Sequence, residues 1–184
     1  MSAPLYDELS GREAGAYGCL FCRSGREQKI IRELTRLTPE VSAVSPAKVR
    51  IRRSREGSSE ELVTLFPGYV FFRVAEGAPD VGRFARLEDV LRLLTYADGE
   101  WRLAGSDEAI AREFFGEDGV VGLSKAYYEG DRIRVTEGAL KRYEASITRV
   151  NHRARTAEVR VDFHGKVLTM WLGFELIELS VSNH

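Results

Sequence analysis

Two cysteines, Cys19 and Cys22, have the Cys-x-x-Cys spacing of a redox-active thiol pair or of half a zinc site. They lie in an apolar stretch, residues 17–22, that is typical of a strand, where side chains three positions apart point to opposite faces. No second cluster of Cys and His in the sequence completes a tetrahedral zinc site. We therefore expect two reduced structural thiols, with a thiol oxidoreductase as the enzymatic alternative.

Other enzyme signatures are absent from the sequence. It has no Gly-rich phosphate loop, no Gly-x-Ser-x-Gly elbow and no His-Glu-x-x-His zinc motif. Of its three histidines, His184 is the last residue, His164 precedes a glycine at an expected turn and His152 lies in a basic loop. The sequence therefore predicts a protein that is not an enzyme and uses no metal or cofactor.

Binding is better supported than catalysis, because basic residues are concentrated in one segment. Residues 141–166 carry seven Lys and Arg against three acids, a net charge of +4, whereas the whole chain has a net charge of −1. Guanidinium groups bind phosphate bidentately, and Asn and His add hydrogen-bonding groups. The candidate RNA-binding residues are Lys141, Arg142, Arg149, Asn151, His152, Arg153, Arg155 and Lys166. A solvated charged loop is the alternative interpretation.

A second candidate surface lies at a Pro-Gly turn that runs directly into an apolar strand. Pro67 fixes φ and lacks a backbone donor, and Gly68 adopts a φ that other residues refuse. Phe66 and Tyr69 flank this bend, which suits a docking surface. A core strand with a tight turn is the alternative interpretation.

The elements that must position these residues fall into two groups along the chain. The first group is expected to begin with a strand over 16–22 and a helix whose capping box is Ser24 and Glu27. A hairpin over 48–65 follows, with its tip at 57–59. The remaining elements are a helix over 79–87, a strand over 90–96 and a last helix from Ser106. Because strands and helices mix without regular alternation, we expect an α+β fold with a mostly antiparallel sheet.

The second group begins at Gly130, where the pattern changes to short alternating strands. The expected strands cover 133–135, 147–150, 159–163, 167–171 and 174–179. Five short strands in so short a stretch predict a small closed all-β barrel.

These groups divide the 184 residues into two small domains. We expect a frayed leader over 1–15, a first domain over 16–115, a linker over 116–128 and the barrel over 129–180. The sequence shows no signal peptide and no apolar run long enough to span a bilayer. A cytoplasmic monomer without membrane contact is expected.

Two segments resemble the NusG family of transcription elongation factors: Leu-Phe-Pro-Gly-Tyr-Val over 65–70 and Gly-Asp-Arg-Ile-Arg-Val-Thr-Glu-Gly over 130–138. The segment over 130–138 is similar to the start of a KOW motif. The resemblance implies an NGN domain that binds RNA polymerase and an SH3-like KOW barrel that recruits other factors. By the same resemblance, the residues that meet the polymerase are Tyr17, Phe66, Pro67 and Tyr69.

The sequence departs from the family where Gly-Pro-Leu/Phe-x-Gly-x-x-Gly is usual. Ala139, Arg142 and Ala145 stand in place of Pro, Gly and Gly, while Gly138 is kept. The segments 121–131 and 149–155 most resemble antiterminators of the LoaP type, which act on selected long operons and whose KOW domain is associated with RNA recognition. The leading hypothesis is a processive antitermination factor that binds polymerase and an RNA hairpin in the nascent transcript.

Two alternatives stay open at this point. One is a general elongation factor of the NusG type, whose barrel recruits a termination helicase or a ribosomal protein. The other is a stand-alone KOW RNA-binding protein without polymerase contact. A further basic strip is a candidate contact for non-template DNA, and its residues are Arg23, Arg26, Lys29, Arg32, Arg50, Arg52, Arg53 and Arg55.

Overall fold

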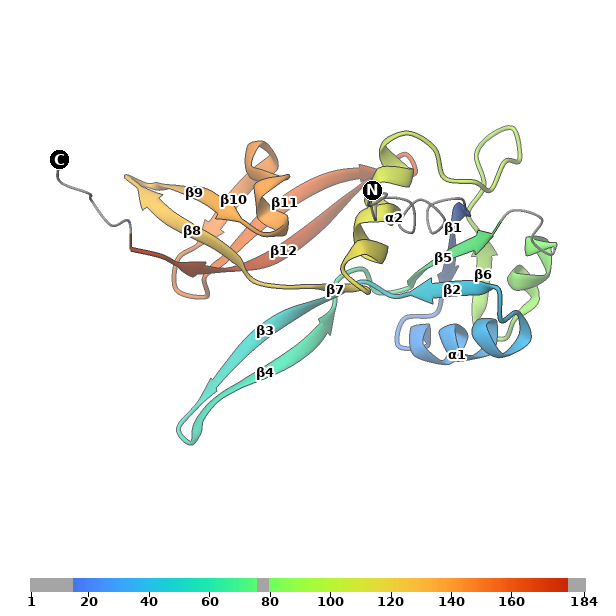
Figure 1. Cartoon of the computed structure of the whole chain (residues 1–184), viewed down its shortest axis with the longest axis horizontal. Helices are drawn as coiled ribbons and strands as arrows, with labels where there is room; N and C mark the ends of the chain where they lie inside the picture. The colour runs from blue at the N-terminus through green and yellow to red at the C-terminus, as the bar shows by residue number, and fades with distance from the viewer. Residues whose placement is uncertain (1–14, 76–79, 179–184) are drawn as a thin grey trace, which may run out of the picture. The chain divides into compact units, whose positions relative to one another are not determined.

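The computed structural model describes residues 15–75 and 80–178, without the side chains of residues 53 and 54. The chain divides into two compact units: unit 1 combines Met1–Val44 with Gly68–Arg112, and unit 2 combines Ser45–Pro67 with Glu113–His184. Few helices and mostly antiparallel strands make up the described residues (Figure 1), which confirms the α+β class. The leader expected over 1–15 lies outside them, except for Gly15. None of the helices in the described ranges is long and apolar enough to cross a membrane.

Unit 1 is built on a four-stranded antiparallel sheet in the order β2-β5-β1-β6 (Figure 1). Its strands are β1 (Gly15–Cys22), β2 (Val41–Val44), β5 (Tyr69–Ala75) and β6 (Val90–Leu93). The helix α1 (Glu27–Leu37) presents Ile30 and Leu34, one turn apart, to a core that also contains Phe72. The strand expected over 16–22 and the helix that follows it are thus confirmed.

The capping box expected at Ser24 does not form. Helix α1 has Arg26 at its N-cap, which makes no side-chain cap hydrogen bond. The Glu27 carboxylate, which a capping box would direct back to the start of the helix, accepts a hydrogen bond from the Gly68 N–H at 2.7 Å instead. A tertiary contact has therefore replaced the local one.

The remainder of unit 1 follows the expected order with shorter elements. The segment expected as a helix over 79–87 is, in its described part, the 3-10 helix η2 (Val81–Arg86), and β6 ends at Leu93 rather than at 96. Phe84 of η2 packs edge-on against Phe72, at 5.4 Å between ring centroids, and Trp101 stacks on Phe72 at 5.6 Å. The last helix, α2 (Ser106–Gly116), begins at the predicted residue.

The expected hairpin forms in unit 2. Strands β3 (Ala47–Ser54) and β4 (Gly57–Thr64) pair antiparallel along their full length, and the short strand β7 (Val120–Val121) pairs parallel with β3. Ser54 pairs with Gly57, so the turn lies at 55–56 rather than at 57–59. Gly57 is the first residue of β4 and has a φ of +139°, a conformation that glycine adopts readily.

The C-terminal part of unit 2 is a five-stranded sheet in the order β10-β11-β12-β8-β9. Its strands are β8 (Ser124–Glu129), β9 (Arg132–Glu137), β10 (Ile147–Asn151), β11 (Thr156–Phe163) and β12 (Lys166–Leu176). Leu140, Phe163, Met170 and Leu172 are fully buried and form its core. This β-rich region agrees with the expected KOW-type barrel in its number of strands.

Two strands of this sheet differ from the sequence prediction. Strand β8 lies, except for Glu129, within the range expected as a linker. The two strands expected over 167–171 and 174–179 are one strand, β12. β12 pairs antiparallel with β11 up to Gly173 and then parallel with β8 from Phe174. Gly173 does not mark a turn. A Cβ there would lie 2.5 Å from Leu123, so the glycine allows close packing where the strand changes partner.

Candidate functional site

The Pro-Gly turn is held by hydrogen bonds to the backbone of Gly68. Gly68 has a φ of +88°, and a Cβ at this position would lie 2.9 Å from the Cys22 carbonyl oxygen. The Gly68 carbonyl accepts a hydrogen bond from the Cys22 N–H at 2.8 Å, and its N–H donates to the buried Glu27 carboxylate. Only glycine fits this backbone, which fixes where β5 and Tyr69 begin.

The four residues expected to meet RNA polymerase differ in exposure. Tyr17 and Phe66 are only 3% and 4% exposed, so the expectation that Phe66 is an exposed anchor is wrong. Phe66 packs edge-on against Phe114 at 5.6 Å, and the Tyr17 ring lies under the Arg112 guanidinium at 5.3 Å. Pro67 is exposed and Tyr69 is half-buried.

Tyr69 belongs to a small aromatic surface that the sequence did not reveal. Its ring packs edge-on against Phe21 at 5.2 Å, and the Arg92 guanidinium lies 5.5 Å above the Phe21 ring. Phe21 is half-buried and Arg92 is exposed. The pairing of Phe21 with both Tyr69 and Arg92 across β5, β1 and β6 brings these residues together, and no local sequence pattern shows that register.

The Cys-x-x-Cys pair is buried. Cys19 and Cys22 are free thiols, 0% and 1% exposed. Burial raises the pKa of Cys19 well above its ordinary value, and burial followed by the nearby Glu27 carboxylate raises the pKa of Cys22 to about 11. Because thiolates are the nucleophiles and metal ligands, these thiols are unsuited to either role. Within residues 15–75 and 80–178, no three Cys, His, Asp or Glu side chains group as a metal site.

A basic groove of about 900 Å³ lies on the C-terminal sheet. Its cations are Arg132 and Arg134 of β9, Lys141 and Arg142 of the segment that follows, and Arg149 of β10. Two acids, Asp131 and Glu144, also line it, as does His152. Five cations against two acids give this groove a positive charge although the whole chain has a net charge of −1.

Most groove cations also have contacts within the protein that orient them. Arg134 donates to Glu129 at 2.6 Å, Lys141 donates to the Thr136 carbonyl at 2.9 Å, and Arg149 lies 4.0 Å from Glu158 and 5.9 Å from the Trp171 ring centre. The Arg149 side chain is nevertheless 72% exposed. The Arg134–Glu129 pair is exposed on both sides, and exposed ion pairs contribute little to stability, so Arg134 can exchange its acid for a phosphate at low cost.

The segment that carries Lys141 and Arg142 is fixed at both ends. Gly138 has a φ of +91°, and a Cβ there would lie 2.7 Å from the Ser124 Cα. The buried Ser124 hydroxyl accepts a hydrogen bond from the Leu140 N–H at 3.0 Å at the start of the 3-10 helix η3 (Ala139–Lys141). The Tyr143 hydroxyl donates to Glu113 at 2.7 Å, and Arg142 lies 3.2 Å from the same carboxylate.

Three of the predicted residues lie in the turn after β10, residues 152–155, and a fourth, Asn151, is the last residue of the strand. The Asn151 side chain accepts a hydrogen bond from the Ala154 N–H at 2.9 Å, and Arg155 has a φ of +51°. Asn151 therefore shapes the turn. His152 points its ring at Tyr128, with 5.1 Å between ring centroids.

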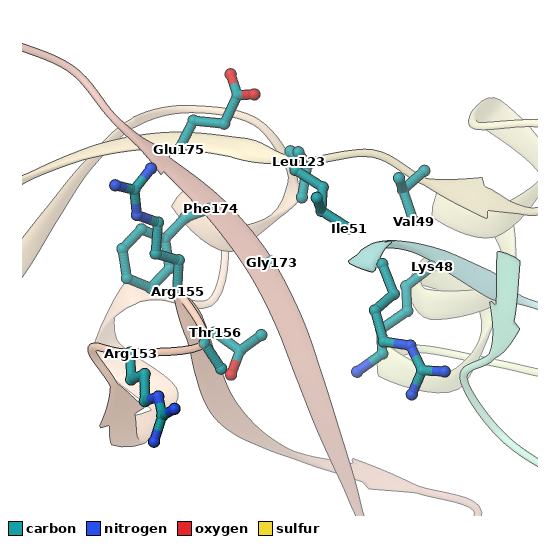
Figure 2. Close-up of a pocket in the computed structure, with 12 residues that line it drawn as sticks. Lys48, Val49, Ile51, Leu123, Arg153, Arg155, Thr156, Gly173, Phe174 and Glu175 are labelled. Carbon is teal, nitrogen blue, oxygen red and sulfur yellow. The ribbon is translucent and has the colours of Figure 1, made fainter. Parts of the chain in front are cut away.

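Arg153 and Arg155 line a second pocket, of about 430 Å³. Figure 2 shows both arginines beside Thr156 and near Phe174 of β12. The structure thus brings Lys141, Arg142, Arg149 and His152 to the groove and Arg153 and Arg155 to this neighbouring pocket. Lys166 lies in neither, because it starts β12 at the opposite end of β11 from the turn.

Arg132 and Arg134 are the groove residues that sequence reasoning missed. They alternate with the buried Ile133 and Val135 along β9, so both face outward. The alternation Arg-Ile-Arg-Val was visible in the sequence and could have identified them.

Comparison with known proteins identifies one family. A family model described as transcription termination factor nusG matches residues 16–111, more than half of the chain. A solved structure described as "Domain interaction in Thermotoga maritima NusG" is 17% identical and has a TM-score of 0.43, covering 86% of this chain and 93% of that one. This structural likeness is too weak to add to the family match. No curated protein matches the chain.

Proposed function

The chain belongs to the NusG family of transcription factors, and from this premise we propose that it is an operon-selective elongation and antitermination factor. Unit 1 would bind RNA polymerase, and the basic groove of unit 2 would bind an RNA hairpin in the nascent transcript. The family is not a family of enzymes, and the buried thiols suit packing rather than catalysis.

The observation that carries the RNA-binding part is the basic groove. Phosphate contacts supply most of the affinity of proteins for nucleic acid, and this groove gathers five cations from three separate segments of the chain. Arg142, which stands where the family pattern has glycine, is one of them. A specialised paralog of the LoaP type would use this added charge to select its transcripts.

For polymerase binding, the support is the surface of Tyr69, Phe21 and Arg92. Tyr and Arg are among the side chains most enriched at binding hot spots, and Phe is enriched in interfaces. Tyr69 sits directly after the rigid Pro-Gly turn, which presents it in one orientation. We propose that this surface of unit 1 meets the polymerase.

The two halves of the proposal are tested together by footprinting the full chain on a halted elongation complex, with and without leader RNA from candidate operons. We expect polymerase protection in both cases and RNA protection only with the cognate leader. Arg132→Glu/Arg149→Glu should abolish RNA protection and keep polymerase protection. Lys166→Glu is the matched control, because it changes charge in the same sense away from the groove.

One result would favour the general factor instead. The cations Arg134, Arg142 and Arg149 already have acidic neighbours, which lowers the charge available to RNA. If the full chain binds polymerase but no leader RNA, and its barrel binds a termination helicase or a ribosomal protein, the general factor is favoured.

A further inference from the structure

We propose that the groove binds RNA through an unpaired nucleotide, whose base stacks on the exposed rings of Tyr128 and His152. We call these two side chains the aromatic platform. The inference rests on the proposed RNA-binding function and specifies which form of RNA it selects.

The platform joins two segments that are distant in sequence. Tyr128 lies near the end of β8, and His152 lies in the turn after β10. Their ring centroids are 5.1 Å apart with 38° between the planes. Tyr128 is 37% exposed and His152 is exposed, so the rings pack on each other without being covered.

Tyr128 is exposed because of its place in the strand. Along β8 it follows the fully buried Ala126 by two positions, so both side chains point to the same face. Ala126 lies in the core, whereas Tyr128 lies one residue before the end of the strand, where that face meets solvent. Tyr128 pairs with Ile133 of β9, so these two side chains share one face of the strand pair, and Ile133 lines the groove.

The platform and the groove meet at His152, which belongs to both. A nucleotide has two recognisable parts, an anionic phosphate and an apolar base face. The groove offers Arg132, Arg149 and their neighbours for the phosphates, and the platform offers aromatic rings for the base. Stacked bases on aromatic side chains beside a cationic track are the usual means of binding single-stranded nucleic acid.

This arrangement selects against continuous duplex RNA. In an A-form helix the base faces are stacked on one another, so they are not available to a protein ring. A hairpin loop, a bulge or a single strand presents a free base face. An acidic peptide would pair with the cations but would offer no base to stack on the platform.

The test compares two synthetic RNAs with the same number of phosphates, one a hairpin with 2-aminopurine in its loop and the other a blunt, fully paired duplex. Because every base has a π-face, the loop sequence need not match a natural target. Full-length protein should bind the hairpin more tightly and quench its 2-aminopurine fluorescence. Tyr128→Ala should weaken hairpin binding roughly 5- to 150-fold and leave duplex binding unchanged, while Tyr128→Phe retains both. His152→Ala should weaken hairpin binding by a similar factor and duplex binding by less, because His152 also lines the groove.

Failure of this inference is distinguishable from failure of the proposed function. If hairpin and duplex bind equally and both alanine variants match wild type while Arg132→Glu/Arg149→Glu abolishes binding, the groove binds RNA and the platform has no role. If wild-type protein binds neither RNA nor a candidate leader, both ideas are overturned. Should Tyr128→Ala lose its cooperative unfolding transition, His152→Ala still decides, because His152 lies in an exposed turn.

Discussion

A single buried carboxylate ties helix α1 to the Pro-Gly turn. Glu27 is 6% exposed and accepts the Gly68 N–H at 2.7 Å. Glu27→Ala would leave this buried N–H without its partner, which costs about 1–3 kcal/mol. We expect a loss of that size in the free energy of unfolding by urea. Glu27→Gln keeps an acceptor oxygen and should lose much less, so equal stability of the alanine variant and wild type would contradict this role.

The buried thiols should make the free energy of unfolding decrease as the pH rises into the alkaline range. The pKa of Cys22 is raised from 9.0 to about 11 in the folded protein, chiefly by burial. A raised pKa means that folding favours the protonated thiol. The resulting stability is therefore complete below pH 9 and is lost as the pH rises through about 11. Urea midpoints measured across this window should fall for wild type and fall less for Cys22→Ala. Parallel curves would contradict the assignment.

Substitutions of Tyr69 and Phe66 should have different effects, one on polymerase binding and the other on the stability of the fold. Tyr69 is half-buried on the aromatic surface of unit 1, so Tyr69→Ala should keep the fold and weaken polymerase binding by about 2 kcal/mol, the size of a hot-spot residue. Phe66 is 4% exposed, so Phe66→Ala should mainly lower stability, by about 3–5 kcal/mol. Affinity for polymerase and urea unfolding, measured on both variants, distinguish the two effects. If Phe66→Ala instead weakened polymerase binding without loss of stability, and Tyr69→Ala only lowered stability, Phe66 would be the residue that anchors the polymerase.

At the scale of elements, the packing of β1 against β5 requires a glycine at position 18, where any side chain would meet Phe72. Gly18 faces Phe72 across the pair, and a Cβ there would lie 2.2 Å from the Phe72 ring. That ring cannot retreat, because Phe84 and Trp101 pack on it. Gly18→Ala should destabilise unit 1 by about 1–3 kcal/mol through overpacking. Gly116→Ala, where a Cβ meets nothing within 4 Å, is the matched control and should be neutral or slightly stabilising in thermal unfolding.

Elements with strong periodicity were predictable from the sequence, and those determined by tertiary contacts were not. The hairpin alternates charges and forms as expected, and α1 shows clear helical spacing. Strand β8 was missed because its inward residues are the small Ser124 and Ala126, which give almost no apolar alternation. The sequence prediction divided β12 in two, and the residues between its two parts include Gly173, which serves close packing inside one continuous strand.

The same limit applies to the candidate site. Sequence reasoning found Lys141, Arg142, Arg149 and His152, because basic residues within one segment are visible without a fold. It could not show that Lys166 lies at the far end of β11, since strand length and register decide that separation. It also placed Phe66 at the surface, because an aromatic residue at a turn has the same sequence pattern whether it is buried or exposed.

At the scale of the whole molecule, charge distribution matters more than net charge. The chain carries a net charge of −1, so long-range attraction would not bring it to nucleic acid. Any affinity for RNA must come from local contacts such as those that the groove offers.

This charge distribution predicts a specific salt dependence for the full chain. Each phosphate that a groove cation neutralises releases counterions, so log affinity for an RNA hairpin should fall linearly with log salt. Arg149→Ala removes an exposed groove cation and should flatten that slope by roughly one unit. Lys166→Ala removes the same charge outside the groove and should leave the slope unchanged. Fluorescence anisotropy over a salt series measures both slopes. If both variants flattened the salt slope equally, RNA affinity would depend on the overall charge of the protein. The groove would then not be the RNA-binding site.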